Sequence, residues 1–232
     1  PGMGELIDTS VLIVGAGPVG LTLAMDLADR GVDVVVAEMR GRSEPPEVRC
    51  NHVSARSMEI FRRLGVAEDL RQAGLPADYP NDVAYRTTFT GHELTRIPIP
   101  CRRDRFTVTD GPDGWWPTPE PPHRINQLFM EPVLVAHAVS RPNLTLRTRT
   151  RIDSFTEHED GVEAVATDLD RSAELRIRCR LLVGCDGGRS DVRRRIGAAF
   201  EGDAVIQRVQ STFIRAPSLI DRQRHAPAWA TF

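Results

Sequence analysis

The first 38 residues carry the pattern that most constrains the fold of this chain: a strand, a glycine-rich turn, a helix and a second strand. Residues 9–14 form an apolar run rich in β-branched side chains, which predicts a strand buried on both faces, as in a parallel sheet. The sequence G-A-G-P-V-G follows, and apolar residues then recur at helical spacing until Gly31. Residues 32–37 predict a second buried strand, so the unit indicates an α/β fold built on a parallel sheet.

The glycine-rich turn has the spacing that a nucleotide diphosphate requires at the start of a helix. Gly15 permits the tight turn, Gly17 lets a diphosphate approach the backbone, and Gly20 lets helix and strand pack closely. The free amides and the positive end of the helix would then hold the negative charge. We expect nucleotide contacts from the whole motif, which comprises Gly15, Gly17, Pro18, Val19 and Gly20.

Glu38 ends the second predicted strand, 18 residues after Gly20. An acid at this place typically accepts hydrogen bonds from the ribose hydroxyls of a bound dinucleotide. Its negative charge disfavours a ribose that carries a 2′-phosphate. The pattern therefore fits either FAD or NAD and does not decide between them.

The middle of the chain alternates between helical and strand patterns. We expect an amphipathic helix over residues 54–64, a β-hairpin formed by 82–89 and 93–97, a proline-rich loop over 98–122 and a helix over 127–139.

The remaining part reads mainly as strands. Three alternating runs, 144–152, 162–167 and 173–179, predict a three-stranded antiparallel meander. A buried strand at 181–184, a short helix at 191–196 and a new strand pattern over 205–214 follow.

A second motif, V-G-C-D-G-G-R-S-D-V-R, begins at the end of the buried strand. Asp186 follows this strand, where a carboxylate can accept hydrogen bonds from the ribitol or ribose hydroxyls of a cofactor. Gly187 lets the backbone approach a ligand. Arg189, Ser190 and Arg193 favour a binding role over a plain turn, which is the alternative.

This motif resembles the G-A-D-G-x-x-S-x-V-R fingerprint of flavin-dependent aromatic hydroxylases, the para-hydroxybenzoate hydroxylase group of single-component monooxygenases. Two further stretches resemble segments of that family: R-C-N-H with S-A-R-S-M-E-I-F-R-R-L-G, which begins at Arg49, and R-I-N-Q-L, which begins at Arg124. The resemblance implies that Arg49 and Gln127 contact the flavin diphosphate and ribitol, with Arg124 near them. The branches that act on phenylpropionates, chlorophenols and aromatic polyketides are the most similar.

The resemblance implies an FAD-dependent monooxygenase that hydroxylates a small aromatic substrate, phenolic or polyketide. NAD(P)H would reduce the FAD, dioxygen would form a flavin hydroperoxide, and one oxygen would pass to the ring. Because the cofactor carries this chemistry, we assign no catalytic side chain. Two alternatives remain open: a nucleotide-binding fragment or subunit without turnover of its own, and a flavoenzyme of the same fold that performs Baeyer–Villiger oxidation or epoxidation.

The family fold implies two domains in this chain. A Rossmann-like FAD-binding domain would comprise residues 3–80 and 98–201, and the start of a β-rich substrate-binding domain would comprise 81–97 and 202–232. The family's later G-D-A-A-H-x-x-x-P segment is absent. We therefore expect the N-terminal half of a longer enzyme, completed by a C-terminal half or by a second chain, and a homodimer remains open.

All 30 basic residues are arginine, since the chain contains no lysine, and this excludes lysine Schiff-base and general-base chemistry. A formal net charge of −2 argues against a nucleic-acid partner. The four cysteines form no C-x-x-C pair, no zinc spacing occurs, and no apolar run reaches about 18 residues. We expect a cytoplasmic protein with free thiols, no metal site and no membrane span.

Overall fold

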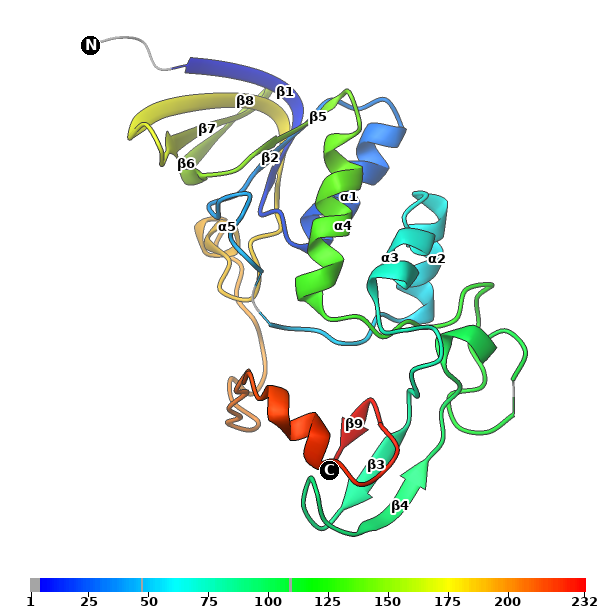
Figure 1. The fold of residues 1–232 in the computed structure, drawn as a ribbon. Coiled ribbons are helices and arrows are strands. Elements are labelled where there is room, and N and C mark those ends of the chain that lie inside the picture. The colour runs from blue at the N-terminus through cyan, green and yellow to red at the C-terminus, as the bar shows by residue number, and fades with distance from the viewer. Residues whose placement is uncertain (1–4, 47, 109) are drawn as a thin grey trace. The chain divides into compact units, whose positions relative to one another are not determined.

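The computed structural model describes residues 5–46, 48–108 and 110–232 (Figure 1). The chain packs as two units. The first comprises Pro1–Pro46 and Glu131–Ile206, and the second comprises Glu47–Met130 and Gln207–Phe232. These are units of packing, so the division into FAD-binding and substrate-binding domains stays a prediction, and residues 3, 4, 47 and 109 of the first predicted domain lie outside the described residues.

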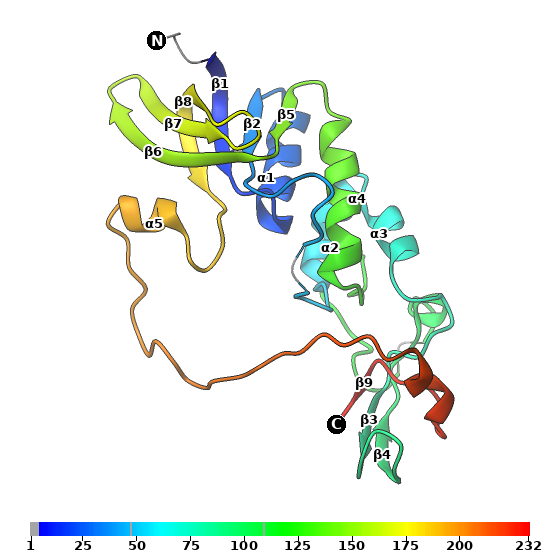
Figure 2. The same ribbon diagram turned by 60° about the vertical axis from the view of Figure 1, so that its left-hand side comes forward.

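The first unit is built on a six-stranded sheet with the strand order β5, β2, β1, β8, β7, β6 (Figure 2). The strands are β1 (Glu5–Val14), β2 (Val34–Ala37), β5 (Leu144–Arg147), β6 (Thr150–His158), β7 (Gly161–Asp168) and β8 (Ala173–Gly184). The four strands β5, β2, β1 and β8 run parallel, and α1 (Pro18–Asp29) packs against three of them as the crossover. The predicted α/β fold with a parallel sheet is confirmed.

Strand β8 joins the parallel and antiparallel parts of the sheet. It pairs Gly184 with Val14 of β1 in parallel, and Cys179 with Val162 of β7 in the antiparallel direction. The sequence predicted two strands, 173–179 and 181–184, and this division is wrong. The two edges of one strand accept different partners, so a single strand serves both.

The predicted strand over residues 144–152 is also divided, because Arg149 adopts a φ of +53° between β5 and β6. A left-handed residue does not fit within a continuous strand. β5 therefore pairs with β2, while β6 turns back to pair with β7. The predicted meander is present, but β6, β7 and β8 form it.

The centre of the sheet is buried on both faces. Leu12 and Ile13 are consecutive residues of β1 that point to opposite faces, and both are 0% exposed. One face packs the cluster Leu12, Val35, Ala37, Ala164, Ala166, Leu175, Ile177 and Cys179. This burial explains why β1 and β2 read as continuous apolar runs in the sequence.

The second unit contains short elements: α2 (Ala55–Arg63), α3 (Ala67–Ala73), β3 (Val83–Arg86), β4 (Glu93–Ile97), the 3-10 helices η1 (Arg102–Asp104) and η2 (Pro217–Arg222), and β9 (Ala230–Thr231). α2 begins as predicted, because the Ser54 hydroxyl accepts a hydrogen bond from the Ser57 amide at 3.2 Å. The hairpin β3–β4 is confirmed, whereas α3 was not predicted. The predicted helices at 127–139 and 191–196 are α4 (Gln127–Val139), which crosses the boundary of the two units, and α5 (Asp191–Arg195) of the first unit.

The strand predicted over residues 205–214 is wrong. The segment has strand-like alternation, but it is exposed and has no regular structure. No described strand lies beside it to accept backbone hydrogen bonds, and a strand is stable only with such a partner. The strand that does form from this end of the chain is β9, which pairs in parallel with β3.

Arginine side chains connect β9 to the hairpin. Arg86, whose side chain is 0% exposed, donates hydrogen bonds to Glu93 and to the Ala226 carbonyl. Arg96 bonds Glu93, Asp82 and the same carbonyl. Hydrogen bonds from Arg96 and Arg86 lower the pKa of Glu93 to about 2. The hairpin and the end of the chain are therefore connected by charge-assisted bonds as well as by the β3–β9 pairing.

Leu12→Ala tests the central role of β1. We expect this change to lower the free energy of unfolding by about 2–5 kcal/mol, because it removes buried methyl groups and leaves a cavity. Leu181→Ala is the matched control, since Leu181 lies on the neighbouring strand β8 and is 64% exposed; a change of about 0.5 kcal/mol or less is expected. Urea unfolding followed by circular dichroism measures both, and equal losses would contradict the assignment of the core.

Candidate functional site

The glycine-rich turn contains two glycines that no other residue can replace and one that leaves open space. Gly15 has a φ of +104°, and an added Cβ would lie 2.4 Å from the carbonyl oxygen of Cys185. A Cβ on Gly20 would lie 2.0 Å from the carbonyl oxygen of Gly15. A Cβ on Gly17 would meet nothing within 4 Å. Gly15 and Gly20 therefore serve packing, whereas Gly17 leaves its backbone accessible to a ligand.

Helix α1 begins without a capping side chain. Gly17 is its N-cap residue, Pro18 lies in the first turn, and this turn contains no acidic residue. Val19 is 71% exposed. The first amides of the helix therefore lack a side-chain acceptor, and the positive end of the helix dipole faces open space at Gly17. This arrangement suits an anion such as a diphosphate.

Glu38 lies beside this helix start. Its Oε2 accepts a hydrogen bond from the Ala16 amide at 2.8 Å, and its Oε1 accepts one from the Arg40 amide at 2.9 Å. Because each carboxylate oxygen can accept two hydrogen bonds, Oε2 retains capacity for a ribose hydroxyl. The backbone of the glycine-rich turn thus orients the acid that the sequence predicted for this role.

Two residues that sequence reasoning missed hold Glu38 from the other side. Arg40 Nη2 donates a hydrogen bond to Glu131 Oε1 at 2.6 Å, and Arg40 Nε reaches Glu38 at 3.3 Å. Burial lowers the pKa of Arg40, but the hydrogen bond to Glu131 and the charges of both glutamates raise it overall. Glu131 is only 3% exposed, on α4. No local signal marks this contact, since Arg40 and Glu131 are 91 residues apart.

Asp186 lies next to the glycine-rich turn, because β1 and β8 are parallel neighbours whose carboxyl ends meet. The Cys185 amide bonds the Val14 carbonyl at 2.7 Å, and the Asp186 Cα lies 3.1 Å from where a Cβ on Gly15 would be. The structure therefore brings together the two motifs, about 170 residues apart in sequence, that the sequence predicted to bind one cofactor.

The Asp186 carboxylate is already engaged in hydrogen bonds to its own loop. Oδ1 accepts one from the Ser190 hydroxyl at 2.5 Å, and Oδ2 accepts those of the Asp191 and Val192 amides at 2.7 and 3.2 Å. Burial raises the pKa of Asp186, but these hydrogen bonds lower it overall. Asp186 thus stabilises the start of α5, and its contact with a cofactor stays a prediction.

The other predicted residues of this loop differ in their surroundings. Gly187 has a φ of +81°, which explains the glycine. Ser190 caps α5 by accepting a hydrogen bond from the Arg193 amide at 3.0 Å. The Arg193 side chain bonds the Gly188 carbonyl at 3.0 Å and lies over the Phe200 ring. The Arg189 side chain is exposed.

Three predicted cofactor residues belong to the second unit. The Gln127 amide donates hydrogen bonds to the carbonyls of Arg49 and Cys50 at 3.2 and 3.0 Å, so Arg49 and Gln127 are neighbours, and their contact with a cofactor stays a prediction. The Arg124 guanidinium instead lies 3.8 Å from the centre of the Trp229 ring and 3.6 Å from Asp113. Its contact with a cofactor stays a prediction.

His123 has a structural role in the second unit. His123 is buried, and its Nε2 lies 2.8 Å from the Leu70 carbonyl oxygen. Burial lowers the pKa of His123 to about 4, so the ring is neutral at pH 7.

Among the described residues, no group of three or more His, Cys, Asp or Glu side chains is arranged to hold a metal ion. No described helix is both long and apolar enough to cross a membrane.

Comparison with known proteins identifies the family. A family model described as an FAD-binding domain matches residues 8–230. The chain belongs to this family. It is 32% identical over 227 residues to a tetracenomycin B2 monooxygenase-dioxygenase of Streptomyces olivaceus, a match that covers 91% of this chain and 40% of the relative. It is 29% identical over 204 residues to a phenol 2-monooxygenase of Pseudomonas sp. (strain EST1001), covering 86% and 32%.

Solved structures agree with this assignment. RebC, a rebeccamycin biosynthetic enzyme with reduced flavin, is 40% identical with a TM-score of 0.73, over 83% of this chain and 35% of RebC. The flavin-dependent monooxygenase PieE, in complex with FAD and substrate, is 29% identical with a TM-score of 0.71, over 85% and 33%. The chain therefore has the fold of FAD-dependent aromatic hydroxylases, as the resemblance predicted, and it spans 32–40% of the length of the two curated relatives.

The residues of the first unit fit FAD. The uncapped start of α1 and the open space at Gly17 suit its diphosphate. The unfilled acceptor capacity of Glu38 Oε2 suits the adenosine ribose. FAD is the cofactor that the family and the FAD-bound structure of PieE both indicate.

Gly17→Ala separates binding from folding. The added methyl would occupy the space in front of the helix start, so we expect FAD affinity to fall about tenfold or more, a cost of at least about 1.4 kcal/mol. Stability should fall by only about 0.5–1 kcal/mol, since alanine is a poorer N-cap residue than glycine. Flavin fluorescence titration and thermal unfolding of the apoprotein measure the two effects.

Gly20→Ala is the contrasting variant. Its Cβ would overlap the Gly15 carbonyl oxygen, and backbone atoms cannot move aside cheaply. We expect it to destabilise the apoprotein by at least about 2 kcal/mol. A Gly17→Ala protein that binds FAD as tightly as the wild type would contradict the assigned diphosphate site.

Asp186→Asn tests the carboxylate at the start of α5. Since the folded-state pKa of Asp186 is depressed, its stabilising effect is present above the unfolded pKa, about 3.9, and is lost as pH falls through the folded pKa. At pH 7 we expect the variant to be about 1–3 kcal/mol less stable. This difference should shrink below about pH 4 in acid unfolding experiments. Asp203→Asn, at an exposed carboxylate, is the control and should leave the free energy of unfolding at pH 7 within about 0.5 kcal/mol of wild type.

Proposed function

We propose that this chain is the FAD-binding part of a monooxygenase that hydroxylates a small aromatic substrate, phenolic or polyketide, with NAD(P)H and dioxygen. The observation that carries the proposal is the uncapped start of α1 at Gly17 with Glu38 beside it. The printed names of the relatives support the reaction class, since they include a phenol 2-monooxygenase and a tetracenomycin B2 monooxygenase-dioxygenase.

The residues of this chain bind and orient the cofactor, and bound FAD supplies the redox chemistry. The amides at the start of α1 hold the diphosphate, and Glu38 accepts hydrogen bonds from the adenosine ribose hydroxyls. Arg40 is a positioning residue, because its guanidinium donates hydrogen bonds to both Glu38 and the buried Glu131. Loss of these hydrogen bonds would let the Glu38 side chain turn away from the ribose.

Further cofactor contacts are proposed for residues of both units. The resemblance supports Arg49 and Gln127, which are neighbours in the second unit. Arg124 and the loop residues Asp186, Gly187, Arg189, Ser190 and Arg193 complete the proposed set.

The FAD-binding domain is proposed to comprise residues 3–80 and 98–201, and the partial substrate-binding domain to comprise 81–97 and 202–232. The unpaired thiols of all four cysteines support a reducing location, the cytoplasm.

A second candidate function is favoured by the length of the match. The chain spans only 40% and 32% of the two monooxygenases described above. We therefore propose that the 232-residue chain alone binds FAD without turnover. Oxidation of NAD(P)H by this chain alone, in the presence of FAD and a phenol, would contradict this second proposal.

FAD titration of the whole protein that carries this sequence tests the first proposal. We expect stoichiometric binding with visible flavin absorbance, and phenol-stimulated oxidation of NAD(P)H. Glu38→Gln should weaken FAD binding about tenfold or more, because a charge-assisted hydrogen bond to the ribose is lost. Glu157→Gln, at an exposed residue of β6, is the control and should bind FAD like the wild type. A whole protein that binds no flavin would overturn the proposal.

A further inference from the structure

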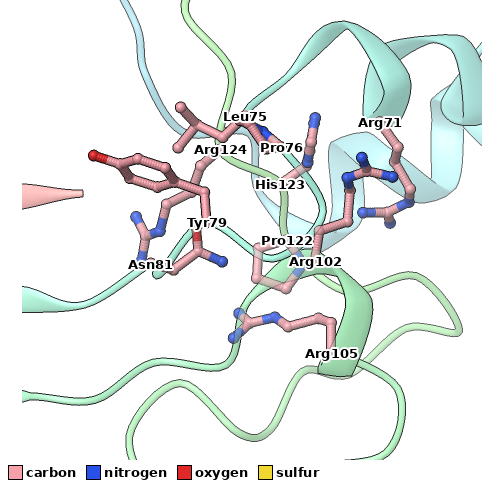
Figure 3. A pocket seen from close by; sticks show the side chains of 10 residues that line it. All are labelled: Arg71, Leu75, Pro76, Tyr79, Asn81, Arg102, Arg105, Pro122, His123 and Arg124. Carbon is pink, nitrogen blue, oxygen red and sulfur yellow. The ribbon is translucent and has the colours of Figure 1, made fainter. Parts of the chain in front are cut away.

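A pocket in the second unit is lined by four arginines (Figure 3). They come from three segments: Arg71 from α3, Arg102 and Arg105 from η1 and the residue after it, and Arg124 from the residues before α4. Only residues of the second unit line this pocket, so the pocket is distinct from the glycine-rich turn of the first unit.

Two of these arginines carry buried N–H groups without an acceptor. Arg105 is only 4% exposed, and its Nε and Nη1 have no hydrogen-bond partner among the described residues. Its Nη2 donates to Asp113 at 2.6 Å, and its guanidinium lies over the Trp116 ring. The buried Nε of Arg102 also lacks a partner. Three unfilled buried donors are costly, because each has given up its hydrogen bonds to water.

The remaining contacts of the pocket leave an excess of positive charge. Arg71 pairs with Glu120 at 2.6 Å, and Asp113 serves both Arg105 and Arg124. Two carboxylates thus face four guanidinium groups, which leaves an excess of two positive charges before the more distant Arg62 is counted. The nearby Asp104 bonds Cys101 and Arg103 instead.

Neither the histidine of the pocket nor the loss of a proton from an arginine removes this excess of positive charge. His123 lines the pocket in its neutral form at pH 7, since burial lowers its pKa to about 4. Burial and the charge of Arg105 lower the pKa of Arg124, whereas Asp113 raises it. A guanidinium nevertheless stays protonated at any pH at which the protein is folded. A bound anion would balance this excess charge.

We propose that this pocket binds a phosphate-type dianion. A dianion balances two positive charges, and its four oxygens supply acceptors for the three unfilled N–H groups of Arg102 and Arg105. The planar fork of each guanidinium matches the spacing of phosphate oxygens. The ligand is a free phosphate ion or the phosphate group of a nucleotide.

The whole protein that carries this sequence is titrated with inorganic phosphate, against sodium chloride at matched ionic strength. We expect phosphate to raise the melting temperature and to give one binding event per chain by calorimetry. Arg102→Gln should weaken phosphate binding about tenfold or more, which is about 1.4 kcal/mol or more. Arg103→Gln is the matched control, since Arg103 lies on the same short helix, pairs with Asp104 and has a side chain that is 63% exposed.

Arg105→Gln provides a second variant at the more buried residue, and circular dichroism checks that each variant is folded. Arg102 forms no ion pair with a described residue, so Arg102→Gln should fold normally even if Arg105→Gln does not. A wild-type protein whose melting temperature responds to phosphate no more than to chloride would overturn the proposal. Equal phosphate affinity in Arg102→Gln and wild type would do the same.

Adenosine 2′-phosphate and adenosine identify the source of the phosphate. Binding is compared in wild type and Arg102→Gln, so that any contribution from the nucleotide site of the first unit cancels. An Arg102-dependent affinity higher than that of inorganic phosphate assigns the pocket to a nucleotide phosphate, and an equal or lower affinity assigns it to the free ion. Arg102-dependent binding of adenosine itself, without a phosphate, would count against an anion site.

Discussion

The close approach of two backbones at the ends of β1 and β8 is the constraint on which the site depends. Gly15 lies so near the Cys185 carbonyl that any side chain there would overlap it, and a side chain on Gly20 would overlap the Gly15 carbonyl even more closely. These contacts bring α1 against the sheet and expose the amides at its start. Glycine is required at both positions by packing, before any ligand is considered. The proposed cofactor site is therefore a consequence of how tightly strand and helix pack.

The same approach brings distant acids to one end of the sheet. Glu38 follows β2 and Asp186 follows β8, while β1 lies between these two strands. The backbone amide of Ala16 orients Glu38, and the amides of α5 orient Asp186. The two carboxylates differ in what they still offer a ligand. Glu38 retains an acceptor site on Oε2, whereas Asp186 already accepts three hydrogen bonds.

Sequence reasoning succeeded where local physics decides the structure. The turn after β1, the helix that follows Ser54 and the hairpin are set by a few neighbouring residues, and all were predicted. It failed where distant partners decide. The break at Arg149 and the absence of a strand over 205–214 depend on which strands lie alongside. The tie between Arg40 and Glu131 likewise depends on how α4 packs, which periodicity alone does not reveal.

The chain contains no lysine, and several arginines occupy positions at which a lysine could not replace them. Arg86 and Arg96 each bond carboxylates and carbonyls at once, a use that needs a planar group with several donors. A buried lysine without a partner can lose its proton and become neutral, but a guanidinium cannot. Arg102 and Arg105 place such permanent charge in a pocket with too few carboxylates. Since deprotonation is excluded, we propose that an added anion restores both the charge balance and the missing hydrogen bonds.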